Sequence, residues 1–208
     1  YGQATSVPCE VWFEEVNNKP ENWTLGDKAG WDPSGYFIEN YEEVTIFADN
    51  GSIELDSWWV ENNLSNPTII FLHGLASSKN SPDILLPMGM MNKSDFNLLA
   101  IDYRDHGKST CEDGFYSAGQ NETDDVAAAI NWLKEKGVKS SNIGIYGSSL
   151  GSLIALMTPA KTNDFGSIAV IDPPVDFTTL VREELSYQGL PTFLWEPIYH
   201  YARVFKGT

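Results

Sequence analysis

One serine in this chain has neighbours that fit it to act as a nucleophile. Residues 147–151 read Gly-Ser-Ser-Leu-Gly, so Ser149 stands between two glycines in the pattern Gly-x-Ser-x-Gly. The apolar run 143–146 precedes the pattern and the stretch 152–157 follows it, which predicts a buried strand, a sharp turn and a helix. Such a turn exposes the central hydroxyl, and the helix N-terminus favours the negative charge that develops during acyl transfer. We therefore predict that Ser149 is a nucleophile; the alternative is a Gly/Ser turn between a core strand and a core helix.

Two other apolar runs end in motifs of chemical interest. The run 68–72 is followed by His-Gly-Leu, and the run 97–101 is followed by Asp-x-Arg-x-His-Gly-x-Ser over 102–109. Continuous apolar runs are typical of strands that are buried on both faces of a parallel sheet. Upstream, residues 43–59 surround the turn Asp-Asn-Gly, which is a strong signal for an antiparallel hairpin.

The order of these motifs resembles the α/β-hydrolase superfamily. The hairpin is similar to that of its serine aminopeptidase-like and membrane-associated serine hydrolases, and the resemblance covers about residues 33–208. It implies an α/β-hydrolase fold, with a mostly parallel sheet, helices on both faces and a helical cap that begins after the sixth strand. The alternation of strands and helices along the chain favours the same architecture.

The resemblance also implies roles for individual residues. Ser149 matches the nucleophile, the backbone N–H of Leu150 matches one donor of the oxyanion hole, and the N–H of Leu75 is our choice for the second donor. The histidines His73 and His106 precede the nucleophile, whereas the order in this fold is Ser, acid, His. We therefore expect these two histidines to brace loops rather than to act as the catalytic base.

The chain departs from the family pattern after the sixth strand. The two remaining strands, which normally carry the acid and the base, are absent from it, so we expect it to be a fragment. Asp172 is a candidate acid, although a turn or helix-capping role is commoner for such a residue. His200 is a candidate base, although it lies among aromatic residues that favour a packing role. We expect the true base beyond residue 208, and little or no ester hydrolysis by residues 1–208 alone.

The remaining pattern predicts the elements that position these residues. Strands are expected near 43–48, 53–60, 68–73, 97–102, 142–147 and 167–172. Helices are expected near 81–92, 122–136 and 149–160, with cap helices near 178–188 and 192–205. We expect one domain in three parts: an N-terminal extension over 1–35, an α/β-hydrolase core over 36–177 and the start of the cap over 178–208.

The composition narrows the range of partners. The chain has 29 Asp and Glu against 13 Lys and Arg, for a net charge of −16, and such a surface repels nucleic acid and anionic membranes. It has no apolar run of about 18 residues, so no membrane span is expected, although a signal or anchor before Tyr1 stays open. No spacing of histidines and carboxylates predicts a metal site. Cys9 and Cys111 lie outside any Cys-x-x-Cys motif, and their pairing is left open.

Together these features predict a serine hydrolase that cleaves an ester, thioester or amide through an acyl-enzyme on Ser149, without a cofactor. The substrate is expected to be a small molecule or an acyl or peptide compound, and an esterase or thioesterase is favoured over a serine peptidase. The alternative is a non-catalytic binding protein with the α/β-hydrolase fold. The oligomeric state and the compartment stay open.

Overall fold

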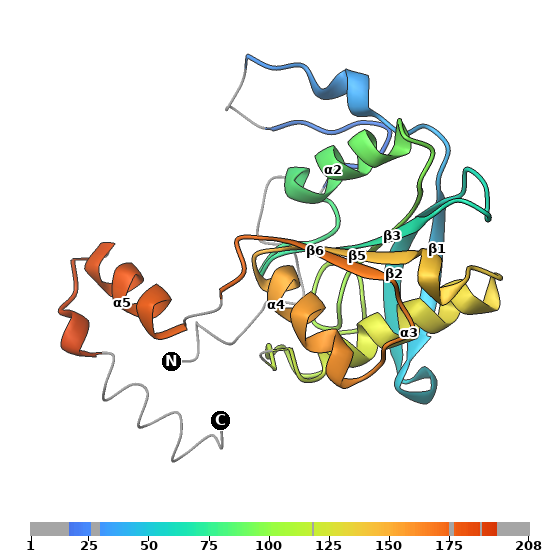
Figure 1. Cartoon of the computed structure of the whole chain (residues 1–208). Coiled ribbons are helices and arrows are strands. Elements are labelled where there is room, and N and C mark those ends of the chain that lie inside the picture. The colour runs from blue at the N-terminus through green and yellow to red at the C-terminus, as the bar shows by residue number, and fades with distance from the viewer. Residues whose placement is uncertain (1–16, 26–29, 118, 175–176, 188, 195–208) are drawn as a thin grey trace. The chain divides into compact units, whose positions relative to one another are not determined.

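The computed structural model describes residues 17–25, 30–117, 119–174, 177–187 and 189–194 (Figure 1). The chain divides into two compact units: one spans residues 5–173, and the other contains residues 174–208. Each unit is described by itself. The larger unit contains the sheet, the predicted nucleophile and the motifs around it.

A six-stranded sheet forms the centre of the larger unit. Its strands are β1 (Glu42–Ala48), β2 (Ile53–Val60), β3 (Thr68–Leu72), β4 (Asn97–Ile101), β5 (Ile143–Ser148) and β6 (Ser167–Ile171), in the spatial order β1-β2-β4-β3-β5-β6. The pairs β1–β2 and β2–β4 are antiparallel, and the pairs β3–β4, β3–β5 and β5–β6 are parallel. The mostly parallel sheet predicted from the apolar runs is therefore confirmed. Because β3, β4, β5 and β6 run the same way, the motifs that follow them emerge at one edge of the sheet.

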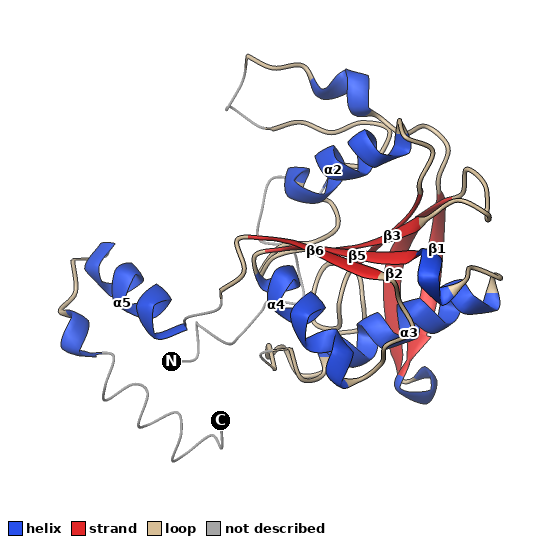
Figure 2. Ribbon diagram, in the orientation of Figure 1, coloured by secondary structure: helices blue, strands red, loops and turns tan. Residues whose placement is uncertain are grey.

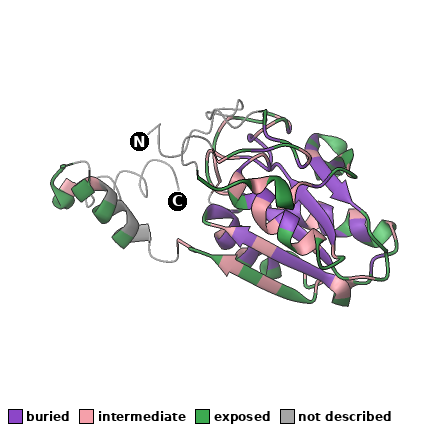
Figure 3. Ribbon diagram, turned by 90° about the horizontal axis from the view of Figure 1, so that it is seen from above, coloured by how far each residue is buried: buried purple, intermediate pink, exposed green. Residues whose placement is uncertain are grey.

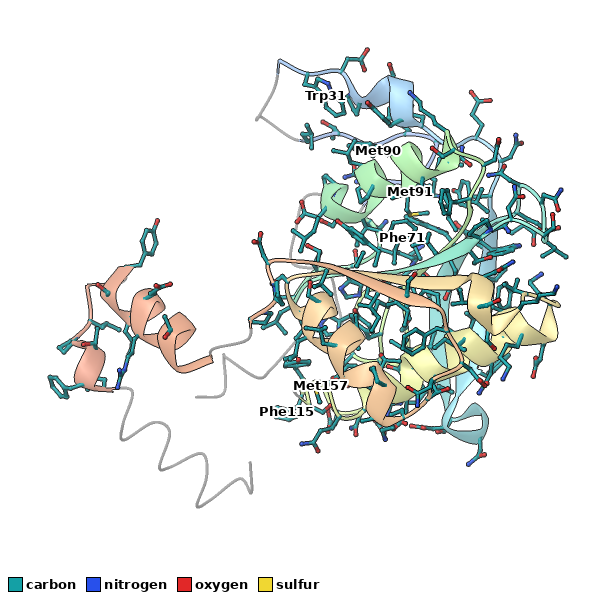
Figure 4. All side chains as sticks on the ribbon, in the orientation of Figure 1. Trp31, Phe71, Met90, Met91, Phe115 and Met157 are labelled. Carbon is teal, nitrogen blue, oxygen red and sulfur yellow. The ribbon has the colours of Figure 1, made fainter. Side chains whose placement is uncertain are left out.

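Helices cover both faces of this sheet. Figures 1 and 2 show α2 (Pro82–Asn92) on one face, and α3 (Glu122–Glu135) and α4 (Leu150–Met157) on the other. Each face has its own hydrophobic core, because the strands are apolar on both sides. Figure 4 shows Phe71 of β3 between the sheet and α2, where it is buried with Ile84 and Met88 of that helix. On the opposite face, Ile130 of α3 and Ile154 of α4 are buried in the other core.

The burial of the strands varies across the sheet (Figure 3). Every residue of the inner strand β4 is buried, whereas residues of β6 alternate between exposed and half-buried. Part of the predicted N-terminal extension also contributes to the α2 face, because Trp23 is buried there. The predicted division at residues 35 and 177 stays a prediction.

The hairpin at the start of the sheet has the predicted turn. Asp49, Asn50 and Gly51 all have positive φ angles, of 48°, 57° and 91°. Asn and Gly tolerate this left-handed conformation better than most residues, which is why Asp-Asn-Gly is a strong turn signal. The turn pairs Ala48 with Ile53 and so sets the register of β1 against β2.

The helix predicted over 149–160 differs from the structure at both ends. It begins at Leu150, because the backbone of Ser149 is not helical, and it gives way to a 3-10 turn at Thr158–Ala160. Pro159 lies in that turn and has no N–H to continue the α-helical hydrogen bonds.

In the second unit, α5 (Phe177–Tyr187) is followed by a short 3-10 turn, Thr192–Leu194. A helix was expected near 178–188, so α5 agrees with that expectation. Most of the second expected cap helix lies outside the described residues. Cys111 is disulfide-bonded, and Cys9, the other cysteine of the chain, lies outside the described residues.

Candidate active site

The backbone of Ser149 is held in an unusual conformation. Its φ and ψ angles are 52° and −115°, at the point where β5 ends and α4 begins. A residue other than glycine held in a sparsely populated region of this kind carries about 1–3 kcal/mol of strain, and such residues cluster at functional sites. Ser149 is exposed, whereas Leu150 and Gly151, which follow it, are buried. The turn therefore presents the serine hydroxyl to solvent, as the Gly-x-Ser-x-Gly pattern predicted.

The two glycines of the pattern are required by close backbone contacts. A Cβ atom on Gly147 would lie 2.3 Å from the carbonyl oxygen of Gly151. A Cβ atom on Gly151 would lie 2.1 Å from the carbonyl oxygen of Leu72, at the end of β3. Any side chain at these positions would force the strand and the helix apart, so the tight turn needs both glycines.

Hydrogen bonds from β6 support the turn from the other side. The N–H of Ser149 donates to the carbonyl oxygen of Ile171 over 2.9 Å. The hydroxyl oxygen of Ser152 accepts from the N–H of Ile171 and lies 2.7 Å from the carbonyl oxygen of Gly147 and 2.6 Å from that of Ile171. Ser152 is fully buried and thus links α4, β5 and β6 directly behind the nucleophile.

The loop after β3 lies against Ser149. A Cβ atom on Gly74 would stand 3.6 Å from the Cβ of Ser149 and 4.0 Å from its Oγ. Leu75, the next residue, is exposed, and Leu150 is the first residue of α4, where backbone N–H groups have no intrahelical partner. That the N–H groups of Leu75 and Leu150 bind an oxyanion stays a prediction, and this arrangement is compatible with it.

The two histidines that precede the nucleophile are buried together. The rings of His73 and His106 lie 5.1 Å apart, and the ring of Tyr103 lies 4.5 Å from that of His73. Burial lowers the pKa of His73 to about 3, so its ring is neutral at neutral pH. Its Nδ1–H donates to the carbonyl oxygen of Gly74 over 2.8 Å, and the Nδ1–H of His106 donates to that of Arg104 over 3.1 Å.

These contacts use the only proton that each neutral ring carries. The Nε2 atoms of His73 and His106 are buried and have no hydrogen-bond partner among the described residues. Neither ring has the exposed, pairable nitrogen that a catalytic base needs. The geometry supports the expectation that both histidines brace loops.

Arg104 connects the motif after β4 to α3. Its Nη2 donates to Oδ1 of Asp125 over 2.7 Å, and its backbone N–H donates to Oδ2 of the same carboxylate over 3.0 Å. Asp125 is fully buried, and it lies in the first turn of α3, where a negative charge is favoured. The motif is also shaped by Gly107, at φ 56°, because a Cβ there would lie 2.0 Å from Oδ2 of Asp102.

Comparison with known proteins identifies the family. The sequence pattern described as the alpha/beta hydrolase fold matches residues 67–194, which is more than half of the chain. The chain belongs to the α/β hydrolase fold family. An esterase of Pyrococcus furiosus has a similar structure, with a TM-score of 0.66 and 29% identity, over 81% of this chain and 63% of the esterase.

Curated relatives of this α/β hydrolase fold protein include a bacterial and a human protein. The uncharacterized protein YqkD of Bacillus subtilis is 32% identical over 67% of this chain and 46% of its own length. The human protein ABHD12B is 30% identical over 67% of this chain and 40% of its own length. This chain therefore spans less than half the length of each of these two relatives. In the part of the chain that the structure describes, no helix is long and apolar enough to cross a membrane.

Of the predicted acid and base of this α/β hydrolase fold protein, the structure describes only the acid, Asp172. Asp172 is exposed and has a φ angle of 51°. Because it directly follows β6, which runs parallel to β5, it lies at the same sheet edge as Ser149, the residue after β5. Its role as an acid stays a prediction. His200 lies outside the described residues. Among the described residues, no histidine or carboxylate forms a hydrogen bond with the hydroxyl of Ser149.

The sequence analysis missed two residues at this site. Ser152 is the third residue of α4, and a serine inside an apolar helix is a weak sign of a buried hydrogen bond. Lys79 lies in a polar loop, and nothing in the local pattern indicates that its side chain is buried. Ser152 reaches Ile171, 19 residues along the chain, and Lys79 has partners 23 residues away on either side.

Proposed function

We propose that this protein is a serine hydrolase in which Ser149 forms an acyl-enzyme. The observation that carries the proposal is the conformation of Ser149, which is strained, exposed and set between β5 and the first turn of α4. A serine that only closed a turn would have no reason to keep this strained geometry, since glycine adopts positive φ angles without cost.

The reaction follows from the groups around this serine. A base takes the hydroxyl proton while Oγ of Ser149 attacks the carbonyl carbon of the substrate, which gives a tetrahedral intermediate with a negatively charged oxygen. The N–H groups of Leu150 and Leu75 donate to that oxygen. The intermediate collapses, the protonated alcohol, thiol or amine leaves, and water then hydrolyses the acyl-enzyme. We expect the base beyond residue 208; within the chain, Asp172 is the candidate acid and His200 the candidate base.

An ester or thioester is the favoured substrate class. The similar structure at 29% identity is that of an esterase, which supports an ester over an amide. The net charge of −16 disfavours polyanionic substrates, because the field of the whole protein repels them. An uncharged acyl compound fits both observations.

A non-catalytic binding protein is the second candidate. The observation in its favour is that no described histidine forms a hydrogen bond with the hydroxyl of Ser149. In such a protein the turn would present Ser149 to a ligand without activating it.

A fluorophosphonate probe separates these two functions. In the full-length protein we expect the probe to label Ser149 and to leave Ser148 unlabelled, because the turn exposes the central serine of the pattern. Ser149→Ala should abolish both the label and ester hydrolysis, and Ser148→Ala should keep both. Label on another serine, or label that persists in Ser149→Ala, would contradict the proposal.

A further inference from the structure

Lys79 is a fully buried lysine in the loop between β3 and α2. Only 1% of its surface is exposed, and its Nζ lies 5.0 Å from the centre of the Trp58 ring. Lysine is almost never fully buried unless its charge is paired. The partners of Lys79 therefore show what the residue does.

Two carboxylates on two strands hold this lysine. Its Nζ donates to Oδ2 of Asp102 over 2.7 Å and also donates to Asp56 of β2. Its backbone N–H donates to Oδ1 of Asp102 over 2.7 Å. Asp102 directly follows β4, so Lys79 is bound to the ends of the sheet through both its main chain and its side chain.

The charge of Lys79 is stable in this environment. Burial opposes the charge, but the carboxylates of Asp102 and Asp56 outweigh it and raise the pKa of Lys79 above its usual value. A protonated lysine has no lone pair, so it cannot act as a general base here. Its role must come from the structure that it holds.

The held segment contains the predicted oxyanion donor. The segment 73–79 begins at His73, whose ring donates a hydrogen bond to the carbonyl oxygen of Gly74. It ends at Lys79, whose backbone N–H donates to Asp102. Gly74 lies against Ser149 at the distances given above, and Leu75 follows it. The position of the Leu75 N–H is thus set by fixed contacts on either side of it.

We propose that Lys79 is a positioning residue of the oxyanion hole, whose ammonium group fixes residues 73–79 against β2 and β4 and so places the Leu75 N–H next to Ser149. This inference rests on the proposed function. Misplacement of a catalytic group by about 1 Å costs roughly a hundredfold in rate, and loss of a whole oxyanion donor costs about 10²–10³. Release of the loop should therefore slow the chemical step more than it weakens substrate binding.

The test is Lys79→Met in the full-length protein, with Lys93→Met as the matched control. Lys93 is an exposed lysine whose Nζ lies 4.2 Å from the centre of the Tyr36 ring, so the control removes a similar aromatic contact without a buried ion pair. We expect kcat for an activated ester to fall about 10–100-fold in Lys79→Met while KM changes less than about threefold. The affinity for a trifluoromethyl ketone that mimics the tetrahedral intermediate should fall by the same factor as kcat/KM. Lys93→Met should match the wild type.

Two further variants keep the test decisive if Lys79→Met fails to fold, since it leaves the buried carboxylate of Asp102 unpaired. The double variant Lys79→Met/Asp102→Asn removes both charges, and Asp56→Asn removes only the partly exposed partner. Near-UV circular dichroism establishes which variants are folded. Folded variants that all keep the wild-type kcat and inhibitor affinity overturn the positioning role.

The same assays distinguish failure of this inference from failure of the proposed function. If Ser149→Ala turns over ester like the wild type, the hydrolase proposal fails. If Ser149 is required and the folded Lys79 variants behave like the wild type, only the role of Lys79 fails.

Discussion

The α-carbon of Gly151 faces the carbonyl oxygen of Leu72 so closely that a Cβ atom on Gly151 would lie 2.1 Å from that oxygen. The first turn of α4 therefore packs directly on the end of β3. Leu72 immediately precedes His73 and Gly74, the start of the loop that lies against Ser149. Two motifs that are more than seventy residues apart thus form one rigid unit, and its precision depends on the absence of a side chain at Gly151.

Gly151→Ala tests this packing. We expect the free energy of unfolding to fall by about 1–3 kcal/mol or more, because the added methyl group must push backbone atoms apart. Gly35→Ala is the control, since its Cβ would meet only Nζ of Lys93 at 3.9 Å, and it should change stability by less than about 0.5 kcal/mol. Urea unfolding of both variants measures the difference. Equal stabilities would mean that α4 can move away from β3 at little cost.

Ser152→Ala tests the link between β6 and the nucleophile turn. The variant removes a fully buried hydroxyl that bonds to the carbonyl oxygen of Gly147 and to the N–H of Ile171, and the loss of these hydrogen bonds should lower the free energy of unfolding by about 1–3 kcal/mol. Ser141→Ala removes an exposed hydroxyl and should lie within about 0.5 kcal/mol of the wild type. Thermal and urea unfolding measure both changes. If Ser152→Ala is as stable as Ser141→Ala, another group satisfies Ile171.

The sheet and the nucleophile turn could be predicted because their signals are local. The apolar runs 68–72 and 97–101 are strands that are buried on both faces, and the Gly-x-Ser-x-Gly pattern requires a close approach within five residues. The buried ion pairs of Lys79 behind the site could not be predicted in the same way. Lys79 is separated by 23 residues from each of its partners, Asp56 and Asp102, and such pairing leaves no periodic trace in a sequence.

The burial of the two histidines predicts a pH dependence of stability. The pKa of His73 is lowered to about 3 from an ordinary value of 6.5, so the folded state binds fewer protons than the unfolded state between these values. The stability due to neutral His73 is therefore fully present above pH 6.5 and is lost as the pH falls toward 3. The slope is about 1.4 kcal/mol per pH unit for one histidine, or roughly 2 kcal/mol between pH 7 and pH 5. Burial lowers the pKa of His106 as well and acts in the same direction.

His73→Asn tests this dependence, because the amide N–H₂ can still donate to the carbonyl oxygen of Gly74 but does not titrate. The loss of stability between pH 7 and pH 5, measured by urea unfolding, should be smaller than in the wild type by about 2 kcal/mol. Tyr103→Phe removes a hydroxyl that donates to the carbonyl oxygen of His73 and leaves the histidines unchanged, so it should keep the wild-type slope. An unchanged slope in His73→Asn would mean that His73 is protonated in the folded protein.

Leu75→Pro tests the second oxyanion donor. Proline has no backbone N–H, and no side chain can replace that donor, so kcat of the full-length protein should fall by about 10²–10³. Leu75→Ala keeps the N–H and should lose much less. Because the side chain of Leu75 is exposed, both variants should stay folded, and thermal melts must accompany the rates to establish this. Proline also restricts the backbone of Gly74, which lies against Ser149, so a distorted loop would show as a lowered melting temperature of Leu75→Pro alone. If Leu75→Pro is folded and turns over ester like Leu75→Ala, the second donor lies elsewhere, and the role proposed for Lys79 loses the group that it is meant to position.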